Sequence, residues 1–175
     1  MNDDELVIVE FLKTGNLKQL HLGMSIDEVT SYLGIPDGFS VSSFKERLSR
    51  TKNAGTMEEP SWFYGCIELI FERKHDTLIF IQVLVEQDRV RNPTQPFRLP
   101  AEFAGNWIER VSKLNSGDMT RLLNDHSIQW HKHPHTPAEM LELDVDDSCV
   151  RIIFDLENAK DVLDSMISDL HCLGA

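Results

Sequence analysis

The spacing of apolar positions divides the chain into helical and strand-like segments. In residues 3–14, leucine and valine recur in steps of three, which predicts an amphipathic helix. Acidic residues fill the first turn of this helix, where they complement its dipole. Residues 66–71 instead alternate between faces, and residues 78–85 are almost continuously apolar. This second pattern predicts a β-hairpin whose second strand lies in the centre of a sheet.

A short helix between these segments is defined by the residues at its ends. Ser25 and Glu28 form an S-x-x-E capping box, which satisfies two free backbone amides at a helix start. Gly34 can adopt the left-handed conformation that ends a helix, and Pro36 prevents its continuation. The pattern therefore predicts a helix that begins after Ser25 and ends before Gly34.

The second half of the chain follows a similar order. In residues 100–114 apolar side chains recur in steps of three and four, which predicts an amphipathic helix, and residues 118–124 predict a shorter one. Residues 141–145 and 149–156 predict a second hairpin. A final helix is expected from about residue 159, with a buried face made by Val162, Leu163, Met166, Ile167 and Leu170.

These elements predict an α+β protein in which an antiparallel β-sheet packs against helices. The expected arrangement is two similar helix-helix-hairpin units in tandem plus a C-terminal helix. The first unit spans residues 1–88, the polar run 89–98 is a linker, and residues 99–175 form the second unit. The pattern leaves open whether the two units share one core.

The charge of the chain narrows the class of partner. The formal net charge is -12 at pH 7, and residues 136–175 hold ten Asp or Glu and two Lys or Arg. Nucleic-acid binding normally rests on clustered Lys and Arg, so it is not expected here. An acidic surface favours solubility, and it also speeds association with a basic protein.

Other features of composition bear on location and cysteine chemistry. The longest apolar runs are too short to span a bilayer, and residues 1–5 are acidic where a secretory signal would be basic. We therefore expect a soluble, cytoplasmic protein with no membrane partner. Cys66, Cys149 and Cys172 lie far apart, so we expect no disulfide framework and interpret them as small buried hydrophobes.

Two stretches in the first half resemble known bacterial proteins. Residues 22–36 contain L-G-M-S-x-x-E-V followed by L-G-x-P, and residues 64–71 read Y-G-x-I-E-L-x-F. The first pattern resembles a motif of the BamE-like fold, of the tandem-repeat β-lactamase inhibitory proteins, and of small cytoplasmic proteins that look like immunity partners of secreted toxins. The second resembles the hairpin entry of that last group. The resemblance covers residues 20–85 and implies an inhibitor built from helix-helix-sheet units.

A histidine cluster is the main chemical candidate. His131, His133 and His135 form H-x-H-x-H, which places three imidazoles on one face of a strand. Neutral imidazoles in this arrangement suit zinc, nickel or copper. Pro134 interrupts a regular strand in the same segment, so an exposed loop without a specific ion is the alternative interpretation.

Four acidic residues follow the histidines. Glu142 and Asp144 share one face of the predicted strand, and Asp146 and Asp147 lie in the turn after it. Paired carboxylates can perform acid-base chemistry or bind calcium, but this run lacks both the spacing of a calcium loop and a neighbouring nucleophile. We therefore predict no catalytic residue, and we interpret the four acids as a partner-binding surface.

Trp62 and Phe63 complete the predicted binding residues. Adjacent side chains in a strand point to opposite faces, and an exposed aromatic ring makes a good interface anchor. Together the features predict a non-enzymatic protein-binding module, an immunity-type inhibitor of a basic toxin or effector. The alternatives are a metal-binding protein that uses the three histidines with zinc or nickel, and a structural or regulatory domain. The oligomeric state is left open.

Overall fold

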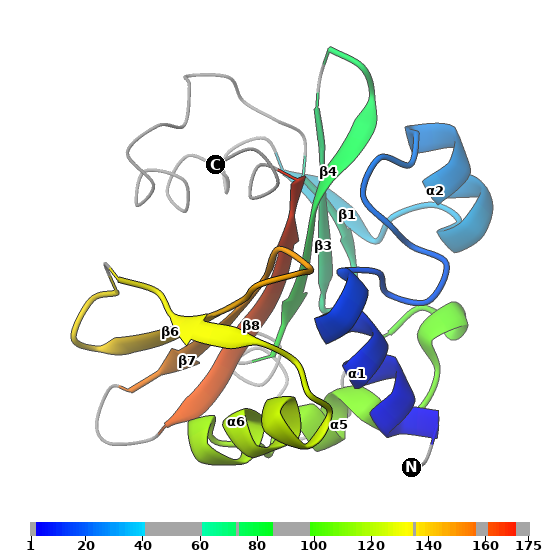
Figure 1. Ribbon diagram of the computed structural model, residues 1–175. Helices are drawn as coiled ribbons and strands as arrows, with labels where there is room; N and C mark the ends of the chain where they lie inside the picture. The colour runs from blue at the N-terminus through cyan, green and yellow to red at the C-terminus, as the bar shows by residue number, and fades with distance from the viewer. Residues whose placement is uncertain are drawn as a thin grey trace.

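The strands of both halves of the chain join in one antiparallel sheet. The computed structural model describes residues 3–40, 61–72, 74–85, 99–134, 136–156 and 161–170. Its strands are β1 (Gly38–Ser40), β2 (Ser61–Tyr64), β3 (Ile67–Glu72), β4 (Thr77–Leu84), β5 (Trp130–Lys132), β6 (Met140–Val145), β7 (Val150–Asp155) and β8 (Val162–Asp169). They follow the order β1-β2-β3-β4-β8-β7-β6-β5 (Figure 1). The β4–β8 pair joins the two halves.

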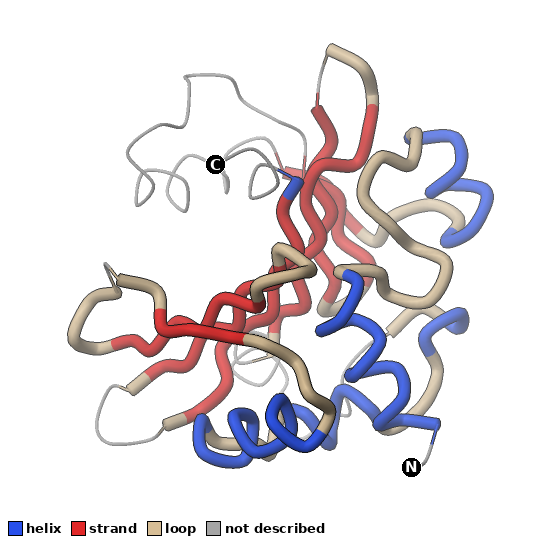
Figure 2. Tube along the Cα trace, viewed as in Figure 1, coloured by secondary structure: helices blue, strands red, loops and turns tan. Residues whose placement is uncertain are grey.

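The helices are short and cover one side of the sheet. They are α1 (Asp3–Thr14), α2 (Ile26–Leu33), the 3-10 helix η1 (Ala101–Phe103), α5 (Trp107–Val111) and α6 (Ser116–Asp125). Helices α1, α5 and α6 lie together against the β6–β8 end, while α2 lies beside the β1–β4 end (Figures 1 and 2). Buried side chains from α1, α2, α5 and α6 and from both halves of the sheet form one hydrophobic cluster.

Helix α2 has the ends that its sequence predicts. The Ser25 side chain accepts a hydrogen bond from the Glu28 amide, and the Glu28 carboxylate accepts one from the Ser25 amide at 2.8 Å. Gly34 ends the helix with a positive φ of 77°. The Tyr64 hydroxyl donates to the Gly34 carbonyl oxygen at 3.0 Å, so the end of α2 is tied to strand β2.

The predicted arrangement of two helix-helix-hairpin units in tandem plus a C-terminal helix is wrong. The segment expected to form the final helix is β8, which pairs with β4 on one side and β7 on the other. The segment that the sequence pattern predicts to be helical is therefore a central strand of the sheet. The expected helix over residues 100–114 is also interrupted, because η1 and α5 are separated by a break at Gly105 with φ of 146°.

The bounds of the two units stay a prediction. The expected linker, residues 89–98, lies outside the described residues. Within the described part of the chain the two halves share one core, since a single hydrophobic cluster contains buried residues from both.

Each of the two central strands carries one extra residue. Ile70 pairs with Phe80 and Phe71 with Leu78, so Ile79 is left between them in β4. A second bulge makes Asp164 the extra residue of β8, because Ile153 pairs with Ser165 and Phe154 with Leu163. Such bulges bend a strand and increase its twist. They accompany the strong curvature of the sheet around the helices (Figure 2).

Close packing at the end of α1 depends on Gly15. Its φ is +72°, and a Cβ atom there would overlap Ser168 Oγ and lie 3.0 Å from the Ser148 carbonyl oxygen. Ser168 itself is fully buried, and its hydroxyl has no hydrogen-bond partner among the described residues. The Ser148 hydroxyl, by contrast, donates to the Leu12 carbonyl oxygen at 2.6 Å. The turn after β6 and the last turn of α1 are therefore in direct contact.

Gly15→Ala is expected to lower the free energy of unfolding by about 2–4 kcal/mol, because left-handed backbone strain and overpacking add. Gly23→Ala is the matched control, since Gly23 has φ of +90° but open space around its Cβ position, and it should cost about 1 kcal/mol. Ser168→Ala should restore part of the loss in a double-mutant cycle measured by urea unfolding. Equal losses at the two glycines would contradict the packing argument.

Alkaline pH is expected to destabilise the fold through Tyr64. Burial, together with the nearby Asp37 carboxylate, raises the pKa of Tyr64 to about 12. The folded protein keeps the phenol proton that the unfolded chain loses near pH 10, so stability should fall as pH rises from about 10 to 12. The chain has two tyrosines. Near-ultraviolet titration of wild type and Tyr64→Phe therefore isolates Tyr64, and an ordinary pKa for Tyr64 would contradict the prediction.

Candidate functional site

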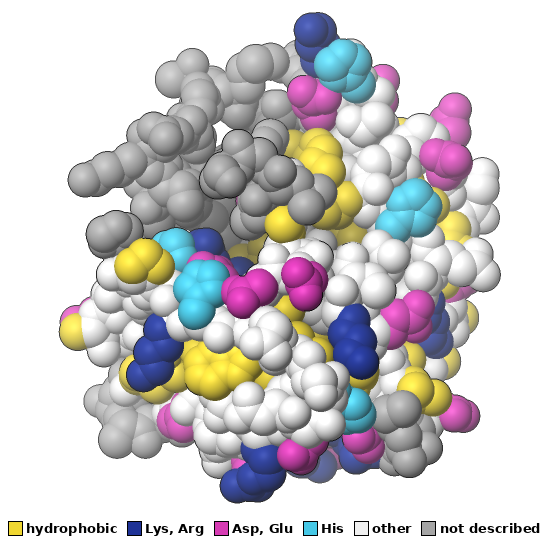
Figure 3. Space-filling view, viewed as in Figure 1, with side chains coloured by type: hydrophobic (Ala, Val, Ile, Leu, Met, Phe, Trp, Pro, Cys, Tyr) yellow, Lys and Arg dark blue, Asp and Glu magenta, His cyan; other side chains and the backbone are white. Residues whose placement is uncertain are grey.

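Acidic and histidine side chains gather over the β6 end of the sheet (Figure 3). Residues opposite each other in the strand register share one face, so His131 of β5, Asp144 of β6 and Arg151 of β7 form a single row. This face is opposite to the one that carries the buried Leu143 and Val145. We call the residues that meet here the outer cluster: His131, His133, Glu142, Asp144, Asp146 and Arg151.

Arg151 holds the two strand carboxylates. Its Nε donates to Asp144 Oδ1 at 2.7 Å, and its Nη1 lies 3.3 Å from Glu142 Oε2. All three side chains are less than a quarter exposed. Because partial burial strengthens a charge-assisted hydrogen bond, these contacts fix both carboxylates in place.

The histidines add a second layer of contacts. His131 Nδ1 lies 2.6 Å from Asp146 Oδ1, and His133 Nδ1 lies 2.8 Å from Asp144 Oδ2. A carboxylate only accepts hydrogen bonds, so each Nδ1 must carry a proton. Arg151 Nη2 lies 3.2 Å from the same His133 Nδ1, and it can donate a hydrogen bond there only in the tautomer whose Nδ1 carries no proton.

The electrostatics of the outer cluster centre on Asp144. Burial raises the pKa of its carboxyl, but hydrogen bonds and charge interactions with Arg151 and His133 outweigh burial and hold the pKa below its ordinary value of 3.8. The carboxylate therefore stays charged to a lower pH than an ordinary aspartate does. Such a group is well suited to orient neighbouring donors, since its own protonation state does not change near neutral pH.

The structure brings some of the predicted residues together and separates others. Glu142 and Asp144 are in the outer cluster, and Asp146 and Asp147 are exposed in the β6–β7 turn. Trp62 and Phe63 lie in β2, five strands away from β6, which corresponds to roughly 24 Å. Trp62 is partly buried against Phe71, with ring centroids 4.8 Å apart. The aromatic pair and the acids do not form one site.

The predicted metal ligands are only partly described. His131 and His133 point to the same face and both approach Asp144, as the H-x-H spacing predicts. His135 lies outside the described residues. Within the described part of the chain, no group of three or more His, Cys, Asp or Glu side chains is arranged to hold a metal ion. Binding of zinc or nickel stays a prediction.

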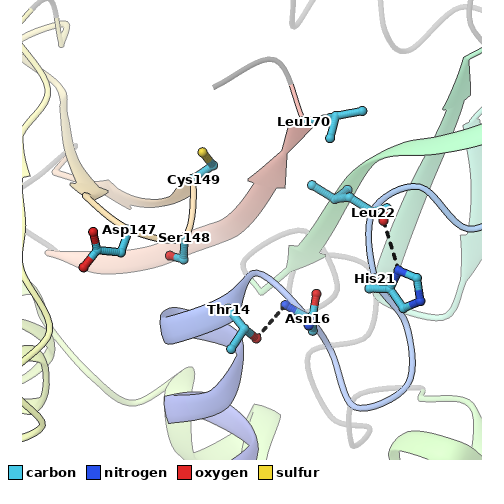
Figure 4. A pocket seen from close by; sticks show the side chains of 8 residues that line it. All are labelled: Thr14, Asn16, His21, Leu22, Asp147, Ser148, Cys149 and Leu170. Carbon is cyan, nitrogen blue, oxygen red and sulfur yellow. Dashed lines mark hydrogen bonds between the residues drawn. The ribbon is translucent and has the colours of Figure 1, made fainter. Parts of the chain in front are cut away.

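A cleft that the sequence analysis missed lies beside the β6–β7 turn. It encloses about 280 Å³ and is lined by Thr14, Asn16, His21, Leu22, Asp147, Ser148, Cys149 and Leu170 (Figure 4). Cys149 was expected in a buried strand, but it belongs to the turn, has φ of 54° and is partly exposed. The lining comes from three distant segments, so only the chain fold could reveal it.

Comparisons with known proteins give no further assignment. No protein-family model, no curated protein and no solved structure matches the chain. Among the residues that the structure describes, no helix is long and apolar enough to cross a membrane.

Arg151→Met is expected to raise the pKa of Asp144 and to lower the free energy of unfolding by about 1–2 kcal/mol, because a partly buried carboxylate loses its partner. In wild type the ionised Asp144 contributes fully to the free energy of unfolding above pH 3.8, its ordinary pKa. This contribution is lost as the pH falls below that value. Arg121→Met, which breaks the exposed pair with Asp118, should change stability by less than about 0.5 kcal/mol. Urea unfolding at several pH values measures both variants, and equal effects would contradict the prediction.

Proposed function

We propose that this protein is a non-enzymatic protein-binding module, an immunity-type inhibitor that masks a basic toxin or effector in the cytoplasm. The observation that supports the proposal is the charge at the open end of the sheet. Glu142, Asp144, Asp146 and Asp147 lie on β6 and in the turn after it, and the guanidinium of Arg151 pairs with the first two, so these five residues carry a formal charge of −3. A surface with this charge attracts and orients a basic protein.

The exposed turn is the part of this surface best suited to recognition. Glu142 and Asp144 already pair with Arg151, so a partner would have to displace those contacts. The Asp146 side chain is 45% exposed, it contacts the His131 imidazole within the described part of the chain, and Asp147 is also exposed. We therefore assign the leading role in binding to the two turn residues, and a supporting role to the strand carboxylates. Trp62 and Phe63 would act as apolar anchors only for a partner that also reaches the far end of the sheet.

A metal-binding role is the second candidate. It is favoured by the shared face of His131 and His133, whose rings both approach Asp144. Two imidazoles and one carboxylate are ligands that zinc accepts. Against it, both Nδ1 atoms are occupied by carboxylates, so the metal would have to bind through the Nε2 atoms. Untagged protein that keeps zinc or nickel after dialysis and gains thermal stability from it would favour this candidate over the inhibitor.

Reversing the charge of the turn is expected to weaken capture of the partner. Asp146→Lys combined with Asp147→Lys should reduce binding of a basic protein from native lysate by about tenfold, since it replaces two attractive interactions by repulsive ones. The measurement is a pull-down on immobilised, untagged protein with stepwise elution by salt, followed by titration of the purified partner. The retained protein should also elute at lower salt from the variant.

Glu102→Lys combined with Asp125→Lys is the matched control for this experiment. Both residues are exposed, and the net charge of the molecule changes by the same amount. The control should bind as wild type does. Equal capture by wild type and by the turn variant would refute a binding role for the acidic turn, and an empty wild-type column would remove the support for the inhibitor.

A further inference from the structure

Strand β5 has a neighbouring strand on one side only. It is the last strand in the order of the sheet, and among the described strands it pairs with β6 alone (Figure 1). An edge strand presents backbone N–H and C=O groups that can pair with another chain. At β5 an extended segment of a partner could therefore add to the sheet as a further strand.

The register with β6 shows which backbone groups of β5 face the open edge. The His133 amide donates to the Glu142 carbonyl oxygen at 3.0 Å. In an antiparallel pair, residues that exchange hydrogen bonds with the neighbouring strand alternate with residues that do not. His131, two positions before His133, therefore also faces β6. The N–H and C=O groups of Trp130 and Lys132 point the other way, to the side of β5 where no described strand lies.

This edge is accessible and short. The side chains of His131 and Lys132 are exposed, and that of Trp130 is partly buried. Pro134 has no N–H group, so it adds no donor beyond Lys132. An added strand would thus find its two backbone donors within the three residues of β5.

The outer face beside the edge favours a basic strand. A residue paired opposite His131 would have its side chain on the face that carries Asp144 and Asp146. The Asp146 side chain lies toward β5, because its Oδ1 is 2.6 Å from His131 Nδ1, and it is 45% exposed. A long lysine or arginine side chain in the added strand can reach this carboxylate. A second copy of this chain, with a net charge of -12, would instead bring two acidic surfaces together.

The opposite face of β5 favours an apolar neighbour. Trp130 packs against the hydrophobic core at this end of the sheet. A residue paired opposite Trp130 would extend the apolar surface of the indole ring. Lys132 belongs to the same face as Trp130, so its charge points away from the acids of the outer cluster.

We infer that the basic partner adds an extended segment antiparallel to β5, with lysine or arginine at alternate positions on the outer face and apolar residues between them. The inference rests on the proposed function, which requires a basic partner. Backbone hydrogen bonds to Trp130 and Lys132 hold the segment, and the Asp146 carboxylate favours its positive charge. The antiparallel orientation follows the described strand pairs, all of which are antiparallel.

The test uses a peptide in place of the partner. Acetyl-Thr-Lys-Val-Arg-Val-Thr-amide is titrated into the labelled full chain, and backbone amides are followed by NMR. In the free chain the Trp130 and Lys132 amides should exchange with solvent faster than the His131 and His133 amides, which face β6. The peptide should shift and protect the two edge amides. Its dissociation constant should be on the order of 1 mM, because a short strand forms few hydrogen bonds.

Modified peptides separate backbone pairing from charge. A methyl group on the first valine nitrogen would lie between the peptide and β5, and it should weaken binding by about tenfold. The same group on the arginine nitrogen would face solvent and should leave binding unchanged. A peptide with glutamate in place of lysine and arginine should not bind. Equal binding of the two methylated peptides, or binding of the glutamate peptide, would overturn the inference.

Lys132→Pro removes one donor from the edge and should weaken binding of the peptide by about tenfold. The β5–β6 pairing should persist, because the Lys132 amide faces away from β6 and proline is tolerated at such positions of edge strands. Lys132→Ala is the matched control, since it removes the same charged side chain but keeps the amide, and it should bind at least as well as wild type. Binding that survives Lys132→Pro would overturn the inference. If that variant does not fold, the methylated peptides give the same test on the wild-type chain.

The inference and the proposed function can fail separately. A chain that ignores the peptide but captures a basic protein through the β6–β7 turn would overturn the strand addition and leave the inhibitor standing. Peptide binding at β5 with an empty pull-down column would support the strand addition and remove the support for the inhibitor. Protection of the edge amides that rises with protein concentration alone would identify a second copy as the occupant and overturn the inference.

Discussion

The pairing of β4 with β8 is the interaction on which the other features depend. Five residue pairs, from Phe80–Asp169 to Leu84–Ser165, join strands that are far apart in sequence. Because β8 is also paired with β7, its position sets the place of the whole second half. Asp161, directly before β8, accepts two hydrogen bonds from Ser116 at the start of α6. Ser168 within β8 packs on Gly15 at the end of α1. The cleft lies where β8 brings these parts together, since its lining comes from the end of α1 and the loop after it, the β6–β7 turn and Leu170.

Elements with strong local signals could be predicted from the sequence, and β8 could not. The capping box of α2 and the two hairpins are specified by neighbouring residues, and the structure has them in the expected places. In β8 the bulge at Asp164 changes the spacing of the inward side chains, so buried Leu163 and Met166 are three residues apart. That spacing is typical of a helix. Long-range pairing, which no local pattern reports, decides the conformation.

In the candidate site, likewise, features set by neighbouring residues could be predicted, and features set by pairing between strands could not. Alternation along each strand indicates that His131 and His133 share a face and that Glu142 and Asp144 do, and both pairs are arranged so; the β5–β6 register then brings the two pairs together. The contribution of Arg151 depends on the register between β6 and β7, which the hairpin pattern alone leaves open. The cleft depends on three segments that meet through the β4–β8 pairing. Trp62 and Phe63 were grouped with the acids although five strand positions separate them.

The contacts within the outer cluster limit how much its carboxylates could contribute to binding a basic partner. A guanidinium and two imidazoles already engage Glu142 and Asp144, so exchanging these contacts for a partner's basic groups would gain little net free energy. The exposed carboxylates of the β6–β7 turn are less engaged and sit at the rim, where charge mainly accelerates and orients association. For the proposed basic partner, the exposed turn would therefore set the rate and orientation of association, and affinity would have to come from other contacts that exclude water.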